Sequence, residues 1–386
     1  MTFAAFYLLS VGLYASVGAV HVLLRRRLKR QHQTRGSSPQ EWPAVDVVVP
    51  VFNEAPDELD GCLASVAAAR YSGPLTVYVV DDGSADSPER TAIYKRYAAL
   101  PFWNILRHSS NQGKRHAQHT AFANGRGSLV LCVDSDTRIA PDSVEALARH
   151  LQDTRVGAVT GAIHIRPDGP IQRLCGVELD AIAAVDRLAQ STYGAVLCCA
   201  GAFVMYRRSA LQSVWAAYLR QRFLGLPVRQ GEDLHLTNLL LEAGLRTRFA
   251  PDGHAWTVAP DRLSGYARQQ LRWSRTHWRE LRWLVPQLGH LPPFLSLDTA
   301  VWSAPALLYA ALPLLWATTS APIMGAAAAV LAIAELLLTI ARTNGHFLWP
   351  QYACLRVLVQ IPVQLWALIT VPSQAWLTRE EVPGIR

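Results

Sequence analysis

The sequence predicts an α/β domain with a doubly wound sheet, attached to one N-terminal and two to three C-terminal membrane helices. β-Branched runs such as Val45–Val51 alternate with helical stretches, which is typical of a sheet buried on both faces. Hydrophobic residues make up 51 % of the 386 residues and charged residues only 17 %. Soluble domains carry about 25 % charge, so part of the chain is expected to lie in lipid.

Residues 2–24 form the first expected membrane helix, because about 20 apolar residues span the hydrocarbon core. A cleaved signal peptide is the alternative. The basic cluster Arg25–Arg30 follows this run and begins a basic linker over 25–42. Basic flanks stay in the cytoplasm, so we expect a multi-pass protein of the cell membrane whose α/β domain lies in the cytoplasm.

Charge and cysteine content exclude several classes of protein. The net charge is +8, but the basic residues cluster beside an apolar run and in a later aromatic-rich stretch. This favours a membrane face and a phosphate-bearing substrate over a nucleic acid. The six cysteines form no CxxC pair and no zinc spacing. We interpret most of them as buried free thiols in a reducing compartment.

The α/β pattern extends over 43–285, the expected cytoplasmic domain. We predict a helix over Pro56–Ala69 and further strands over Leu75–Val80 and Leu129–Val133. Acidic residues directly follow both strands. In doubly wound sheets ligands bind beyond the carboxyl ends of the strands, so these acids are candidate site residues.

The C-terminal third is expected to return to the membrane. Residues 286–299 suggest an interfacial segment, and 300–372 contain helices predicted over 300–318 and 322–341. A third candidate over 354–371 is weakened by Arg356, Pro362 and two glutamines. Residues 373–386 form a tail with the element Trp376-Leu377-Thr378-Arg379.

Two acidic motifs follow the predicted strands. Asp81 and Asp82 precede Gly83, and a carboxylate there can accept bonds from a uracil or a ribose, although a plain turn explains the motif as well. Asp134 and Asp136 follow the strand that ends at Val133. If that segment is extended, both carboxylates point the same way. They could then hold Mg²⁺ or Mn²⁺; a solvated loop is the alternative.

Asp233, in the sequence Gly231-Glu232-Asp233, opens a predicted helix. It could cap that helix or act as a general base that deprotonates a sugar hydroxyl. The two roles do not exclude each other.

Basic residues occur in two further motifs. Lys114 and Arg115 form a turn that could reach phosphate, or could simply be exposed. Gln269, Arg272 and Trp273 belong to a basic aromatic stretch: arginine binds phosphate in a bidentate manner, and tryptophan offers a face to a sugar ring. A helix lying at the membrane surface is the alternative.

Taken in order, the motifs resemble those of the processive family 2 glycosyltransferases. Within that family they are most similar to the branch that contains nodulation protein C, the chitooligosaccharide synthase, and the hyaluronan synthases. The matching stretches are VDVVVPVFNE (45–54), VYVVDDGS (77–84), NQGKRHAQ (111–118), VDSDT (133–137), GAVLCCAG (194–201), MYRRSAL (205–211), GEDLHLT (231–237) and RQQLRWSRTHWRE (268–280).

The resemblance implies a GT-A, Rossmann-like nucleotide-sugar domain and a UDP-sugar donor. It implies that Asp81 and Asp82 hold the uridine, Asp134 and Asp136 the metal, and that Asp233 is the base. Five further residues would bind the donor or acceptor or lie over the site, namely Gln269, Arg272, Trp273, Trp376 and Arg379. Lys114 and Arg115 match the family's GKR turn.

The resemblance favours an inverting enzyme that polymerises N-acetylglucosamine from UDP-GlcNAc through β-1,4 bonds. A hyaluronan synthase-like enzyme that also uses UDP-glucuronate is the alternative. Leu234 stands where the family usually has arginine, which leaves acceptor placement open. A non-catalytic membrane protein that binds nucleotide sugar or polysaccharide is a third reading. The expected partners are the nucleotide sugar, the growing oligosaccharide and the bilayer, with no nucleic acid.

Overall fold

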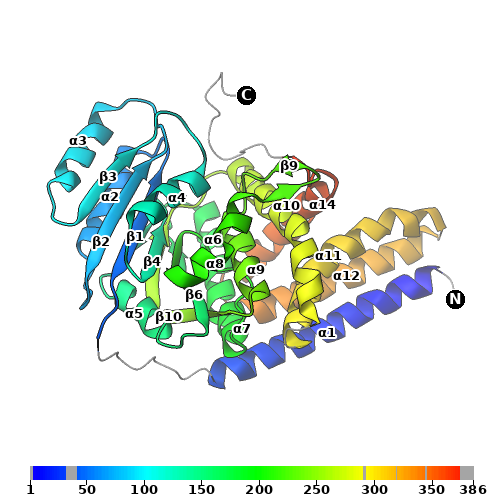
Figure 1. Ribbon diagram of the computed structural model, residues 1–386. Helices are drawn as coiled ribbons and strands as arrows, with labels where there is room; N and C mark the ends of the chain where they lie inside the picture. Colours follow the sequence, from blue (N-terminus) through cyan, green and yellow to red (C-terminus); the bar gives the residue numbers. More distant parts are fainter. Residues whose placement is uncertain (1–2, 32–40, 290–292, 319, 344–345, 374–386) are drawn as a thin grey trace. The chain divides into compact units, whose positions relative to one another are not determined.

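A computed structural model of the protein (Figure 1) describes residues 3–31, 41–289, 293–318, 320–343 and 346–373. The chain forms two compact units that interleave along the sequence. The sheet unit comprises Gln33–Arg166 and Gln190–Val258, and the helical unit comprises Met1–His32, Pro167–Ala189 and Ala259–Arg386. The stretch 43–285, expected as one cytoplasmic domain, therefore contributes to both units.

An eight-stranded sheet forms the centre of the sheet unit, in the order β3-β2-β1-β4-β7-β6-β10-β5. Its strands are β1 (Val45–Val51), β2 (Leu75–Asp81), β3 (Trp103–Arg107), β4 (Leu129–Val133), β5 (Arg138–Ile139), β6 (Val156–Ile165), β7 (Phe203–Arg207) and β10 (Arg246–Thr257). Neighbours from β3 to β4 are parallel. Strand β7 runs antiparallel to both β4 and β6, so the sheet is mixed.

Helices cover both faces of this sheet (Figure 1). They are α2 (Pro56–Ala67), α3 (Pro88–Ala98), α4 (Lys114–Asn124), α5 (Ser143–His150), α8 (Arg208–Leu219) and α9 (Glu232–Glu242), while β8 (Arg222–Phe223) and β9 (Leu226–Pro227) form a small separate hairpin. Helix α4 packs on β1 and β2, and α9 packs on β6 and β10. Helix α7 (Leu188–Thr192) crosses the boundary between the units.

The predicted elements of the sheet unit are found with small shifts. Strands β1 and β4 have the predicted bounds and are buried at every position, as their β-branched composition indicated. Strand β2 extends one residue further, to Asp81, and α2 ends at Ala67, before the predicted end. Proline at the first helical position and two acids in the first turn explain why α2 begins at Pro56.

The helical unit contains four helical segments that are long and apolar enough to cross a membrane: Tyr7–Leu24, Pro293–Pro313, Ala321–Ala341 and Trp349–Ile369. Its elements are α1 (Phe3–Gln31), α6 (Pro170–Ala181), η1 (Ile182–Arg187), α10 (Leu263–Leu288), α11 (Pro293–Thr318), α12 (Ala321–Arg342), α13 (Trp349–Leu355), η2 (Arg356–Gln360) and α14 (Ile361–Ile369). One N-terminal and three C-terminal candidates confirm the membrane helices expected from the sequence.

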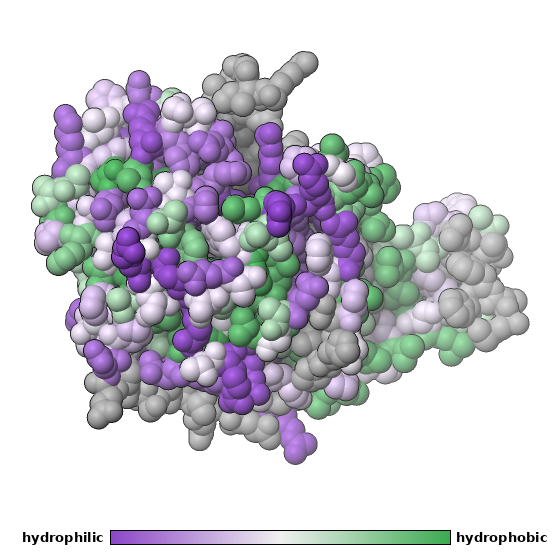
Figure 2. Space-filling model, in the orientation of Figure 1, coloured by the Kyte–Doolittle hydropathy of each residue, from purple (hydrophilic) through white to green (hydrophobic). Residues whose placement is uncertain are grey.

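Helix α1 packs against α11 and α12, and these three helices form long parallel rods (Figure 1). Their outward faces carry exposed apolar side chains such as Leu13, Trp316 and Leu337, and Figure 2 shows hydrophobic colouring along them. Helix α1 continues past the predicted end at residue 24 through the basic cluster to Gln31. The segment 286–299, expected to be interfacial, contains the end of α10 and the start of α11.

Candidate active site

The acidic pair at the end of β2 shapes the loop that follows it. Asp81 accepts hydrogen bonds from the Ser84 amide (2.8 Å) and the Tyr94 hydroxyl (3.0 Å). Asp82 accepts from the amides of Gln112 (3.0 Å) and Gly113 (2.7 Å). Both aspartates are 2 % exposed. These two carboxylates, expected to hold uridine, therefore also fix the loop backbone from β2 to the start of α4.

Gly83 is required by two independent features of this turn. Its φ of +72° is a conformation that only glycine adopts without strain. A Cβ at this position would also lie 2.4 Å from the backbone carbon of Ser110. The turn therefore packs directly against the backbone of the next loop.

The loop after β1 is locked to the same turn and to the Asp134 motif. Asn53, with φ +48°, donates its amide to the Ser84 hydroxyl (2.9 Å) and accepts from the Ala85 amide (2.9 Å). Glu54 accepts a hydrogen bond of 2.6 Å from the Ser135 hydroxyl. Sequence reasoning did not assign Glu54 a role, although it is a third acid placed just after a buried strand.

Residues 134–137 form a turn, closed by the Thr137 amide and the Asp134 carbonyl at 2.9 Å. The expectation of an extended segment here was wrong: the chain bends at this turn, and the buried Ser135 side chain bonds to Glu54. The Asp136 carboxylate accepts from the hydroxyls of Thr137 and Thr257, both at 3.2 Å. Both Asp134 and Asp136 stay partly exposed.

Lys114 joins two of the acidic motifs. Its Nζ lies 2.7 Å from Asp134 Oδ1 and 2.9 Å from Glu232 Oε1. Burial acts to lower the pKa of Lys114, but the two carboxylates outweigh burial and hold that pKa well above its ordinary value. Burial raises the pKa of Asp134, as does Asp136, despite the opposing effect of Lys114. Lys114 is therefore a fixed positive charge inside an acidic cluster.

Asp233 lies in the first turn of α9, and Gly231, with φ +77°, occupies the capping position. The reading of Asp233 as the N-cap was therefore wrong. Its Oδ2 accepts from the Gly201 amide (3.0 Å) and its Oδ1 from the Leu234 amide (2.8 Å). Burial raises the pKa of Asp233, and the neighbouring Glu232 raises it further. A carboxylate with a raised pKa is a better proton acceptor.

We call the side chains of Lys114, Asp134, Asp136, Glu232 and Asp233, together with the Gly201 amide, the acidic cluster. Gly201 permits the close approach of its neighbours, since a Cβ there would lie 3.3 Å from both Lys114 Nζ and Asp233 Cβ. The cluster brings together a carboxylate with a raised pKa, a protonated lysine and further carboxylate oxygens, which are groups that can assist the displacement of an anionic leaving group.

Comparison with known proteins agrees with this chemistry. Residues 46–215 match the family model of glycosyl transferase family 2. A protein of Mesorhizobium japonicum named N-acetylglucosaminyltransferase is 38 % identical over 365 residues, which cover 92 % of this chain and 86 % of the relative. The chain belongs to glycosyl transferase family 2. A Rhizobium meliloti N-acetylglucosaminyltransferase is 39 % identical over 353 residues, covering 89 % of this chain and 83 % of the relative. These matches confirm the family inferred from the motifs.

A solved structure shows the fold of this glycosyltransferase. The mannosyltransferase PcManGT from Pyrobaculum calidifontis, in complex with GDP-Man and Mn²⁺, superposes with a TM-score of 0.65 over 95 % of this chain and 98 % of that chain. The two chains are 24 % identical. The GT-A fold with apolar helices, predicted from the sequence, is therefore confirmed.

The acidic oxygens of the glycosyltransferase fit a hard cation held by few protein ligands. Within the described part of the chain, no three His, Cys, Asp or Glu side chains are grouped so that they could hold a metal ion. Asp134 and Asp136 offer two neighbouring carboxylates. Mg²⁺ is commonly bound by one or two carboxylates together with substrate phosphates and water. These two carboxylates suit a cation whose remaining coordination positions are filled by the diphosphate of a nucleotide and by water.

Arg115 points into the protein rather than toward a ligand. It donates to the Tyr218 carbonyl at 2.7 Å and to the Gln221 side chain, and its guanidinium lies over the Tyr218 ring. It was expected beside Lys114 in phosphate binding. In the structure it ties the start of α4 to the end of α8.

The other expected ligand-binding residues belong to the helical unit or its tail. Gln269, Arg272 and Trp273 lie on α10 of that unit; the first two are partly buried, and Trp273 is 39 % exposed. Trp376 and Arg379 fall outside the described residues.

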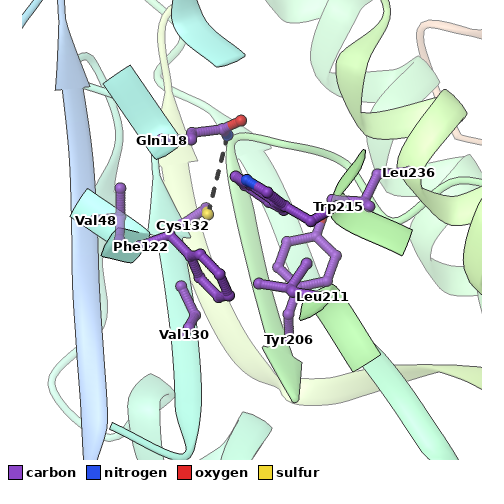
Figure 3. Close-up of a pocket in the computed structure, with 9 residues that line it drawn as sticks. All are labelled: Val48, Gln118, Phe122, Val130, Cys132, Tyr206, Leu211, Trp215 and Leu236. Carbon is purple, nitrogen blue, oxygen red and sulfur yellow. Dashed lines mark hydrogen bonds between the residues drawn. The ribbon is translucent and has the colours of Figure 1, made fainter. Parts of the chain in front are cut away.

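Behind strand β4 lies a small apolar cavity (Figure 3), in which Gln118 faces the Cys132 thiol at 4.0 Å. It is lined by Val48, Gln118, Phe122, Val130, Cys132, Tyr206, Leu211, Trp215 and Leu236. Its walls offer few polar groups, so it is a packing defect of the core rather than a sugar site. Cys132 is one of four buried cysteines, and none of the six cysteines, all in the described part of the chain, forms a disulfide, as expected.

Proposed function

We propose that this glycosyltransferase transfers N-acetylglucosamine from UDP-GlcNAc, with inversion, and builds β-1,4-linked chitooligosaccharide. The observation that carries the proposal is the acidic cluster, in which Asp233 lies beside the Lys114–Asp134 pair. The relatives named N-acetylglucosaminyltransferase support the sugar. The neighbour with GDP-Man and Mn²⁺ supports a nucleotide-sugar donor and a divalent metal.

In the proposed reaction Asp233 takes the proton from the acceptor's 4-hydroxyl. The acceptor oxygen forms a bond to the anomeric carbon of the donor, and the bond from that carbon to the diphosphate oxygen breaks. UDP leaves with the electron pair. Because attack comes opposite the leaving group, an α-linked donor gives a β-linked product in one displacement.

Positive charge assists the leaving group. Lys114, held between Asp134 and Glu232, supplies a cation that can turn toward the diphosphate. Mg²⁺ or Mn²⁺ held by Asp134 and Asp136 would neutralise the developing charge on UDP. On the motifs alone, we assign uridine binding to Asp81 and Asp82, and contacts with the acceptor and the departing diphosphate to Gln269, Arg272 and Trp273. We assign Trp376 and Arg379 a role over the site on the tail motif alone.

We further propose that the enzyme is a multi-pass protein of the cell membrane with its acidic cluster in the cytoplasm. The apolar helices support membrane insertion, and the basic run after Leu24 supports the orientation. UDP-sugars are then available on the catalytic side.

A donor screen tests the function. Membranes that contain the protein are incubated with UDP-GlcNAc, UDP-glucuronate, UDP-glucose or GDP-mannose, with Mg²⁺, Mn²⁺ or a chelator, and the products are analysed by mass spectrometry. We expect a ladder of N-acetylhexosamine units from UDP-GlcNAc alone that chitinase degrades and the chelator abolishes. A requirement for UDP-glucuronate would instead support the hyaluronan-type alternative.

A further inference from the structure

A chain of buried polar side chains runs through the helical unit of the glycosyltransferase. Its members come from α1, α6, α10, α12 and η2, and each is at most 8 % exposed. They are Tyr14, Glu178, Tyr266, Gln270, Glu335, Arg356 and Gln360. We call this set the buried network. Because ionisable groups within apolar helices are costly, they persist where they have matched partners and a role.

One half of the network centres on Glu178 of α6. Its Oε1 accepts from Gln360 Nε2 at 2.8 Å, and its Oε2 accepts from the Tyr266 hydroxyl (3.3 Å) and Gln270 Nε2 (3.4 Å). Gln360 Nε2 also donates to Gln270 Oε1 at 3.1 Å. The Glu178 carboxylate thus receives three donors, and the two glutamines hold each other.

The other half centres on Glu335 of α12. Arg356 Nε donates to Glu335 Oε2 at 3.0 Å, and the Tyr14 hydroxyl of α1 donates to Glu335 Oε1. Arg356 Nη1 lies 3.4 Å from Gln360 Oε1, which joins the two halves. The network therefore connects the first, third and fourth apolar spans to α6 and α10.

The link between the halves is a π-helical turn. Arg356 and Gln360 are the first and last residues of η2. A π-turn inside an α-helix is rare, and it is frequently found at functional sites. Here it presents Arg356 to α12 and Gln360 to α6 and α10.

The hydrogen bonds that Tyr266 and Gln270 of α10 donate to Glu178 fix the rotation of α10 about its axis and its position along that axis. Tyr266 and Gln270 are four residues apart, so they lie on one face of the helix, and both donate to the same oxygen of Glu178. Arg272 and Trp273 follow Gln270 by two and three residues, so they lie within one helical turn of it. An α-helix turns about 100° per residue, following its 3.6-residue period. A slip at Gln270 would therefore change the direction of both side chains.

We propose that Glu178, Gln270 and Gln360 are positioning residues that orient Arg272 and Trp273 on α10, with η2 anchoring them to the membrane helices. The proposal rests on the proposed function, in which α10 handles diphosphate and acceptor. It gives the second glutamine of the Gln269-Gln270 pair a role distinct from ligand binding.

Exchange of the two partners tests the proposal. Glu178→Gln leaves a single acceptor oxygen for the three donors Tyr266, Gln270 and Gln360. The new amide N–H also faces one of these donors, which removes that hydrogen bond. The double variant Glu178→Gln with Gln360→Glu restores a carboxylate–amide pair with its direction reversed, and it places the new carboxylate near Arg356. Asp261→Asn, an exposed carboxylate ahead of α10 with 76 % of its side chain accessible, is the matched control.

Transfer from UDP-GlcNAc is measured for the full chain in detergent, as kcat and as KM for the donor, together with thermal unfolding. We expect Glu178→Gln to lower kcat by about 10-fold or more, the size of a lost hydrogen bond to a charged group. Donor KM should stay within about 2-fold, because ground-state binding of the donor is assigned to Asp81, Asp82 and the metal, whereas Arg272 is assigned to the diphosphate as it departs in the transition state. The double variant should recover most of kcat, and the control should match the wild type.

Wild-type kcat in Glu178→Gln, or a loss of kcat that the exchange does not recover, would overturn the positioning role. If Glu178→Gln does not fold, Tyr266→Phe, which removes one hydroxyl, must lower kcat without changing donor KM, and unchanged kcat there also overturns the role. A wild-type enzyme inactive with UDP-GlcNAc contradicts the proposed function instead, and so the two failures are distinguishable.

Discussion

The acidic cluster of the sheet unit and the buried network of the helical unit both pair a basic side chain with carboxylates, but they differ in access to solvent. In the acidic cluster, the side chains of Lys114 and Asp134 are 20 % and 31 % exposed. In the buried network, those of Arg356 and Glu335 are 7 % and 1 % exposed. Lys114 and Asp134 can therefore be reached by a ligand. Arg356 and Glu335 are buried, and their remaining hydrogen bonds are made to Gln360 and Tyr14.

This difference in exposure fits the two proposed roles, which are reaction chemistry for the acidic cluster and positioning of α10 for the buried network. In the proposed function the carboxylates of the acidic cluster bind a metal ion and Lys114 meets the diphosphate, and these side chains are partly exposed to solvent. A buried pair whose acceptors are taken by protein donors holds helices in place and costs several kcal/mol when one partner is removed. Substitutions in the acidic cluster should therefore affect turnover more than stability, and substitutions in the buried network should affect both.

The largest expected effect is that of Asp233→Asn. Removing the proton acceptor should lower transfer by about 10²–10⁴-fold, while donor binding and thermal unfolding stay close to wild type. Initial rates and equilibrium donor binding measure this. Asp86→Asn, whose side chain is 93 % exposed, is the matched control. Normal turnover in Asp233→Asn would remove Asp233 from the mechanism.

Asp136→Asn should weaken the response to metal. Loss of one of two carboxylates is expected to shift the Mn²⁺ concentration for half-activation upward by about 10-fold or more. Glu335→Gln in the buried network should leave that concentration unchanged, whatever it does to stability. The Mn²⁺ concentration for half-activation is measured for both variants. Equal shifts would show that the acidic cluster has no special role in metal binding.

Ser135→Ala tests whether the turn that carries the two carboxylates proposed to bind metal depends on Glu54. The variant removes the donor to a buried carboxylate, which costs about 1–3 kcal/mol, and it should loosen the turn and raise the metal requirement modestly. Ser213→Ala is the control, because that hydroxyl bonds only within α8, to the Ala210 carbonyl at 2.7 Å. A metal requirement equal to that of the control would show that Glu54 does not hold the turn.

The smallest expected effect concerns acid sensitivity in the helical unit. His277 of α10 bonds to the Ser303 hydroxyl at 3.1 Å, and burial lowers the pKa of His277 to about 3. The unfolded chain, with a histidine pKa of about 6.5, binds the proton first. Stability should therefore fall as the pH drops through the window from about 6.5 toward 3.

His277→Gln removes this titration and should flatten the acid loss of stability. Thermal unfolding in detergent at about pH 7.5 and about pH 5 brackets the unfolded pKa. Identical pH dependence in wild type and variant would show that His277 does not contribute.

Strands and apolar helices could be predicted from the sequence because each follows from a local pattern. β1 is rich in valine and β4 is a continuous apolar run, and α11 and α12 are long enough to cross a membrane. The Asp134 turn could not be predicted in the same way. Its bend depends on a bond between Ser135 and Glu54, which are far apart in the sequence.

The contacts of Lys114 and of the buried network could not be predicted from local sequence patterns either, because they join residues that are far apart in the sequence. Lys114 meets Glu232 only because α4 and α9 are brought together by the sheet. Arg356 and Gln360 counted against the third C-terminal span when read as isolated polar residues. In the structure they are the groups that bond this span to α6, α10 and α12.

The anomeric configuration of the first bond formed tests the central claim most directly. Purified enzyme is given UDP-GlcNAc, a chitooligosaccharide acceptor and Mn²⁺, and the new linkage is assigned by proton NMR before any secondary hydrolysis. A single displacement assisted by Asp233 predicts a β-linked N-acetylglucosamine from the α-linked donor. An α-linked product would show retention and contradict the role given to the acidic cluster.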